Sequence, residues 1–85
     1  MTWKLVWTRP ALKDMKKIGS EQARRVREKV HAFAETGRGD VVKLTDVDPP
    51  EWRQRVGDWR AFLRPDPLTK ELRVLRVKKR DQAYR

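Results

Sequence analysis

Four arginines flank Gly57-Asp58 in the stretch WRQRVGDWRAFLR, residues 52–64, and they are the side chains best suited to chemistry. A guanidinium group matches phosphate oxygens with its planar fork and keeps its charge. Gly57-Asp58 lies between two runs that alternate apolar and charged residues, which predicts a two-residue hairpin turn. That turn sets Arg55 opposite Arg60, and like charges so placed cost roughly 0.2 to 1 kcal/mol. We therefore predict that this hairpin binds an anion.

The same register gives the hairpin two different faces, because directly opposed residues share one side of a sheet. The arginines lie on one face together with Phe62. The other face is mostly apolar and consists of Trp52, Gln54, Val56, Trp59, Ala61 and Leu63. We expect the apolar face to be core and the arginine face to be open. Arg53 and Arg55 are also typical of an ordinary solvated strand surface, and that alternative stays open.

Net charge points to the same half of the chain. The 85 residues include 22 Lys and Arg against 12 Asp and Glu, a formal charge of +10. Residues 52–85 hold 11 basic and 4 acidic side chains, whereas residues 1–51 hold 11 basic and 8 acidic ones. A field concentrated in this way predicts a polyanionic ligand, most commonly nucleic acid. Anionic lipid or a large acidic protein would satisfy the same field.

Length and composition exclude several kinds of site. We expect residues 1–85 to form one domain with one modest core. The chain has no cysteine, which excludes disulfides, thiolate metal sites and a cysteine nucleophile. The single histidine, His31, cannot hold a metal alone, and we expect neither a metal nor a cofactor. No apolar run approaches the roughly 18 residues of a membrane span, so we expect a cytoplasmic protein without membrane contact.

The elements that must position the arginines can be placed by pattern. Residues 3–7 predict a first strand, and Pro10 favours a helix that ends near Gly19, with Leu12 among its apolar residues. Ser20 is expected to cap a second helix that stops at Gly37. Further strands are expected at 41–44, in the hairpin and at 72–77, with turns at 46–50 and 65–67 and a polar tail. The result is an α+β fold of order β-α-α-β-β-β-β, with a helical hairpin packed on one face of a small, mostly antiparallel sheet.

In this order and at this length, the segments resemble the RelE/ParE superfamily of toxins from type II toxin-antitoxin systems. The resemblance runs from an aromatic first strand followed by TRPALKDMKKI, through GDVVKL and WRQRVGDWRAFLRPD, to a last strand that continues into VKKRDQAYR. It implies a RelE-type, ribosome-dependent mRNA endonuclease in which the 2′-hydroxyl attacks the adjacent phosphate. The ParE branch, which poisons DNA gyrase, and a binding module without catalysis are the alternatives.

The resemblance also implies the site and the partners. The residues expected to be catalytic are Arg60, Arg80 and Tyr84. The residues expected to bind RNA or phosphate are Arg53, Arg55, Lys78, Lys79 and Phe62. The expected partners are a cognate antitoxin and mRNA in the ribosomal A site, with contacts to ribosomal RNA.

The expected site departs from the family's pattern in its proton chemistry. Lysines often stand where this chain has Arg53 and Arg55, and some relatives have a histidine where this chain has Lys79. Arginine is a poor general base because its pKa is above about 12. Tyr84 is then the expected base. His31 and the four tryptophans are expected to lie on the helix surface and in the core, respectively.

Overall fold

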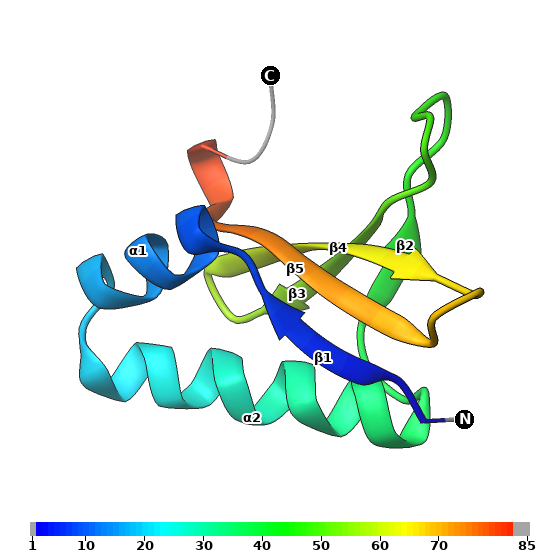
Figure 1. Ribbon diagram of the computed structural model, residues 1–85. Coiled ribbons are helices and arrows are strands. Elements are labelled where there is room, and N and C mark those ends of the chain that lie inside the picture. Colours follow the sequence, from blue (N-terminus) through cyan, green and yellow to red (C-terminus); the bar gives the residue numbers. More distant parts are fainter. Residues whose placement is uncertain (1, 83–85) are drawn as a thin grey trace.

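Two helices lie on one side of a five-stranded sheet in the computed structural model, which describes residues 2–82 (Figure 1). The elements are β1 (Lys4–Trp7), α1 (Arg9–Lys17), α2 (Ser20–Thr36), β2 (Val41–Lys43), β3 (Trp52–Val56), β4 (Trp59–Asp66), β5 (Glu71–Lys79) and the 3₁₀ helix η1 (Arg80–Gln82). This order confirms the predicted α+β fold. Tyr84 lies outside the described residues.

The sheet order is β1-β5-β4-β3-β2, and only the β1 and β5 pair is parallel. The mostly antiparallel sheet is therefore confirmed, with β5 between two neighbours. The segment 44–51 between β2 and β3 projects away from the sheet, and η1 rises from the end of β5 (Figure 1). No helix within residues 2–82 combines the length and the apolar character needed to cross a membrane.

The hairpin register agrees with the prediction along its whole length. Arg55 pairs with Arg60, and Val56 pairs with Trp59 across the turn. Gly57 has a φ of 58°, whereas Asp58 is not among the residues with positive φ. Glycine at the first central position supplies the one left-handed conformation that this turn needs.

Several boundaries differ from the prediction, and the last strand, expected at 72–77, runs over Glu71–Lys79. Pro65 and Asp66 belong to β4 instead of a turn, and the turn at 67–70 is closed by N–H groups of Leu68 and Thr69 that donate to Asp66. Pairing between β3 and β4 ends at Leu63, so the sheet tolerates a proline beyond that point. The cap of α2 is Gly19, and Ser20 is the first helical residue, because the Gly19 carbonyl accepts the Ala23 N–H.

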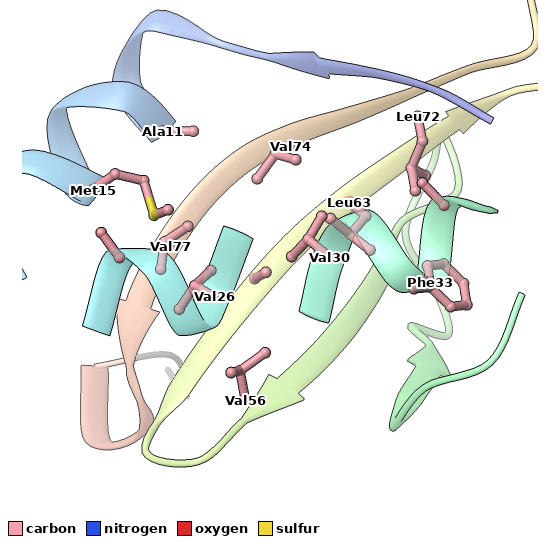
Figure 2. Packing of buried hydrophobic residues seen from close by; sticks show 13 residues of the cluster. Ala11, Met15, Val26, Val30, Phe33, Val56, Leu63, Leu72, Val74 and Val77 are labelled. Carbon is pink, nitrogen blue, oxygen red and sulfur yellow. The ribbon is translucent and has the colours of Figure 1, made fainter. Parts of the chain in front are cut away.

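The core lies between α2 and the sheet. Figure 2 shows Val26, Val30 and Phe33 of α2 facing side chains of the strands. The buried strand residues that face the helices are Val56, Ala61, Leu63, Leu72, Val74 and Val77. All four tryptophans pack against this cluster, and Trp52 makes edge-to-face contacts with Trp3 and Phe33 at centroid distances of 5.9 and 5.7 Å. All four are half-buried, so the prediction that they pack in the core holds for its margin.

Asp14 of α1 covers the part of β5 that β1 leaves unpaired. Pairing with β1 ends at Val74, and beyond it one carboxylate oxygen of Asp14 accepts the Val77 N–H at 2.9 Å. The same oxygen accepts from Arg76 Nε at 2.8 Å, and the other accepts from Arg76 Nη2 at 3.1 Å. A strand edge presents polar groups that need partners, and a buried carboxylate supplies one here. The buried face of α1 therefore consists of Ala11, Asp14 and Met15, and the predicted apolar Leu12 is 49% exposed.

Replacing this carboxylate should destabilise the fold. In Asp14→Ala the Val77 N–H and the Arg76 guanidinium lose their acceptor, and we expect the free energy of unfolding to fall by about 2 kcal/mol. Denaturant unfolding followed by circular dichroism measures the change. Asp81→Ala removes an exposed carboxylate from η1 and should change the free energy by less than about 0.5 kcal/mol. Equal losses in the two variants would contradict the role of Asp14.

The same pair makes stability depend on pH in a defined direction. Burial raises the pKa of Asp14, but hydrogen bonds from Arg76 and Val77 and the charges of Arg76 and Lys78 bring it below 3.8. A carboxyl group with a lowered folded-state pKa stabilises the protein above its unfolded-state pKa, and this contribution is lost as the pH falls through the folded-state value. The difference in unfolding free energy between wild type and Asp14→Asn should therefore be constant above about pH 5 and shrink below about pH 4. A difference that grows on acidification would contradict this assignment.

Candidate nucleic-acid interface

Three cationic residues stand side by side across the middle of the sheet. Arg55 of β3 pairs with Arg60 of β4, and Arg60 pairs with Lys78 of β5. Directly paired residues share a face, and the flanking Gln54, Val56 and Ala61 are buried toward the helices, so the three cations lie on the face opposite the helices. We call Arg55, Arg60 and Lys78 the cationic row.

The members of the cationic row differ in exposure. Arg55 is exposed and Lys78 is half-buried, whereas Arg60 is only 5% exposed. Nη1 of Arg60 donates to the carbonyls of Gly57 at 2.8 Å and Trp59 at 2.9 Å. The guanidinium of Arg60 therefore closes the hairpin turn, and Arg55 and Lys78 present more of their charge to a ligand.

The next row of the sheet contains Arg53, Phe62 and Arg76. Arg53 and Phe62 are both half-buried. Arg76 pairs with Asp14, and Arg64, one residue beyond Leu63, donates to Glu51 at 3.1 Å. The arginine face is thus partly neutralised at Arg64 and Arg76, and the charge is concentrated in the cationic row.

A β-bulge decides which of the two consecutive lysines joins the row. Val74 pairs with Leu63 and Arg76 with Phe62, so Leu75 is an extra residue on β5. The bulge brings Lys78 beside Arg60 and sets Lys79 beside Trp59 on the helix side. Both lysines line a hollow of about 430 Å³ between α1 and η1, together with Lys17, Arg76 and Gln82. The structure therefore brings Lys78 into the row and separates Lys79 from it.

Arg80 is held beside the hairpin turn by its backbone. Its N–H donates to the Asp58 carbonyl at 2.7 Å, and its side chain is exposed. Four of the predicted site residues thus come together near the turn, with Arg55, Arg60 and Lys78 in the sheet and Arg80 next to it. Tyr84, the expected base, lies outside the described residues.

Proton-accepting groups do not gather at the cationic row within residues 2–82. His31 is on the surface of α2, where its Nε2 pairs with Glu35, as predicted for a surface histidine. No three acidic or histidine side chains of this part of the chain lie close enough together to hold a metal ion. What the described arrangement can do is bind and orient phosphate groups.

Sequence reasoning missed the partnership of Asp14 and Arg76. The two residues are 62 positions apart, and neither the helical period nor the strand period marks a buried carboxylate as a cover for a strand edge. The one hint in the sequence was that the charged Asp14 lies on the same helical face as the apolar Ala11 and Met15.

Comparisons with known proteins agree with this fold. Residues 5–84 match a family model described as the ParE toxin of the type II toxin-antitoxin system parDE. A comparison with curated proteins finds no match.

Several solved structures share the fold. The archaeal RelE-RelB complex from Pyrococcus horikoshii OT3 is 22% identical and aligns over 94% of this chain and 97% of that one, with a TM-score of 0.77. The toxin-antitoxin complex RelBE2 from Mycobacterium tuberculosis is 20% identical over 94% and 93% of the two chains, with a TM-score of 0.80. A mutant of the E. coli toxin RelE in the free state is 18% identical over 98% and 88%, with a TM-score of 0.67.

The two paired arginines of the hairpin should differ in their effect on stability. Arg60→Ala leaves the carbonyls of Gly57 and Trp59 without their donor, and we expect the free energy of unfolding to fall by about 1 to 2 kcal/mol. Arg55→Ala removes an exposed guanidinium from the paired position and should change it by less than about 0.5 kcal/mol. Thermal and denaturant unfolding of both variants measure this contrast. A larger loss in Arg55→Ala than in Arg60→Ala would contradict the structural role of Arg60.

Proposed function

The chain belongs to the ParE toxin family of type II toxin-antitoxin systems, and we propose, from its RelE-like fold and its cationic row, that it stops translation by cutting mRNA in the ribosomal A site. The family match covers residues 5–84, so the chain is a toxin of such a system. The structures of similar fold include complexes of RelE with RelB. By analogy, a cognate antitoxin binds this chain and holds it inactive.

The observation that supports RNA as the target is the cationic row with Arg80 beside it. Arg55, Arg60 and Lys78 lie directly across three adjacent strands, although like charges so placed repel one another. A phosphate group bound between Arg55 and Lys78 relieves that repulsion. Arg80, whose N–H donates to the Asp58 carbonyl, lies next to the hairpin turn that joins Arg55 to Arg60.

The reaction assigned to this site needs no group beyond the RNA and the protein. The 2′-oxygen forms a bond to the adjacent phosphorus, and the bond from phosphorus to the 5′-oxygen breaks. The products are a 2′,3′-cyclic phosphate and a free 5′-hydroxyl. The 2′-hydroxyl loses one proton and the departing 5′-oxygen gains one, so the protons and charges of the two RNA products balance those of the substrate.

Each site residue has a role in this proposal. Arg55, Lys78 and Arg80 bind the non-bridging phosphate oxygens, whose negative charge grows in the transition state. Arg60 is a positioning residue, because its Nη1 donates to two carbonyls of the hairpin turn. That turn follows Arg55 in the hairpin and accepts the N–H of Arg80. Tyr84 is proposed as the proton acceptor. The remaining expected RNA contacts are Arg53, Lys79 and Phe62.

Inhibition of DNA gyrase is the second candidate, implied by the resemblance to the ParE branch. The observation that favours it is the composition of the cationic row. Within residues 2–82 the row offers positive charge and no side chain suited to accept a proton near neutral pH. A protein of this kind would bind its target without cutting RNA.

Removing the charge of Arg80 should abolish RNA cleavage and leave the fold intact. We expect Arg80→Ala to slow cleavage of ribosome-bound mRNA by about 100-fold or more, because one charged donor to the transition state is lost. Mapping mRNA ends and following protein synthesis after induction measure this effect. Circular dichroism confirms the fold, and Arg73→Ala is the matched control, since Arg73 is an exposed β5 arginine that pairs with Glu71.

The same experiment separates the candidate functions. Protein synthesis that stops with new mRNA ends supports cleavage, and co-expression of the cognate antitoxin should restore growth. DNA breaks with intact mRNA would establish the gyrase activity instead. RNA binding whose affinity falls steeply with salt, with no cleaved product on ribosomes, would indicate a binding module.

A further inference from the structure

A second cationic hollow lies around the edge of the sheet from the row, between α2 and β3. It has a volume of about 330 Å³. Its lining consists of Arg25, Lys29, Ala32, Arg38, Gly39, Asp40, Gln54, Arg55, Val56 and Gly57. Volumes of this size lie at the lower end of those that hold small organic ligands, and one nucleotide fits that range.

Three cations surround this hollow. Arg25 and Lys29 come from α2 and Arg38 from the loop that follows it, and all three are exposed. Within the described part of the chain, none of these three side chains forms an ion pair. Among the described residues that line the hollow, Asp40 is the one carboxylate, so positive charge exceeds negative charge by two, and the Arg55 side chain adds its charge on the other face of β3. The hollow is therefore suited to an anion.

The walls between the cations are small. Ala32, Gly39 and Gly57 contribute almost no side chain, and Val56 adds an apolar surface. A Cβ atom placed on Gly57 would lie 3.9 Å from Arg25 Nη2, so the guanidinium of α2 reaches the hairpin turn. A small, partly apolar wall beside guanidinium groups suits a sugar-phosphate unit, which has both kinds of surface.

Arg55 connects this hollow with the cationic row. It pairs with Arg60 in the row and also lines the hollow. At this point β3 has no strand neighbour on its outer side, because β2 pairs only with residues 52–54 and the Arg55 N–H donates to the Asp40 carbonyl. An RNA strand that extends from the cationic row past Arg55 therefore reaches Arg25 and Lys29 around this edge of the sheet.

We propose that the hollow between α2 and β3 binds a second phosphate of the RNA strand whose neighbouring phosphate occupies the cationic row. This inference rests on the proposed function, since it extends the same RNA across the edge of β3. Continuity through Arg55 favours RNA over an acidic protein segment as the ligand. Arg25, Lys29 and Arg38 bind the phosphate oxygens, and the wall of Ala32, Gly39 and Val56 contacts the sugar.

The test compares two variants of α2. Arg25→Ala/Lys29→Ala removes two cations of the hollow, whereas Arg27→Ala removes another exposed arginine of α2 that does not line it. Arg25 and Arg27 lie on opposite flanks of the buried Val26, so the control is matched in residue type and helix. Binding of a single-stranded 2′-O-methyl oligoribonucleotide, which cannot be cleaved, is followed by fluorescence anisotropy at several salt concentrations.

The double variant should bind this RNA about 10-fold more weakly at low salt. The slope of log K against log salt should become shallower by roughly 0.7 for each lost phosphate contact, and Arg27→Ala should stay near wild type. If the double variant and Arg27→Ala bind alike, the inference is overturned even where wild type cleaves mRNA. Loss of antitoxin binding with unchanged RNA binding would also overturn it, in favour of an acidic protein.

A second measurement tests phosphate binding at the hollow independently of mRNA cleavage. Titration of the ¹⁵N-labelled full chain with adenosine 5′-monophosphate should shift the amide signals of Gly39 and Gly57, and Arg25→Ala/Lys29→Ala should remove the shifts. These shifts would support the hollow even if wild type failed to cut mRNA, which would overturn the proposed function alone. Absence of shifts at Gly39 and Gly57 in wild type would overturn the hollow as a nucleotide phosphate site.

Discussion

The carboxylate of Asp14 joins the two halves of the molecule, and the position of the cationic site depends on it. It accepts from the Val77 N–H and from two nitrogens of Arg76, which fixes α1 against the end of β5. Burial disfavours the charged form, but the three donors outweigh that cost, so the pKa of the carboxyl group is lowered. Lys78 follows Val77 directly, and Arg80 follows two residues later. A shift of this strand end would therefore move both cations.

Some cationic side chains of the sheet bond to other groups of the fold, and others do not. Arg64 and Arg76 are neutralised by Glu51 and Asp14, and Arg60 turns its Nη1 to two backbone carbonyls. Within residues 2–82, Arg55, Lys78 and Arg80 form no ion pair. Hydrogen bonds from Arg60 to carbonyls spread part of its charge over the turn, which reduces the repulsion from its two neighbours. The hydrogen bonds of Arg60 thus help three cations to stand side by side across the sheet.

The sequence allowed the hairpin to be predicted residue by residue, because a glycine turn and a period of two act locally. It predicted the helices nearly as well, apart from Leu12, which is exposed, and the cap of α2, where Gly19 stands at the position expected for Ser20 and no side chain caps the helix. The residue of β5 that pairs with Arg60 could not be predicted. Strict alternation from Leu72 would set Arg76 and Lys78 toward the helices, but the extra residue at Leu75 reverses the second half of β5. A bulge and a contact across 62 residues depend on tertiary packing, which no local pattern records.

Pairing between β1 and β5 constrains when the fold can form. Residues 4–7 have no strand partner until residues 71–74 exist, and α1 finds its hydrogen-bond partner only at residues 76 and 77. Contacts this distant in sequence are slow to close, because the loop entropy must be spent before the contact stabilises anything. The hairpin at 52–66 can form earlier from local contacts, whereas the strand that completes its cationic row comes later in the chain. A growing chain of this protein therefore remains without its assembled site until most of it has been synthesised.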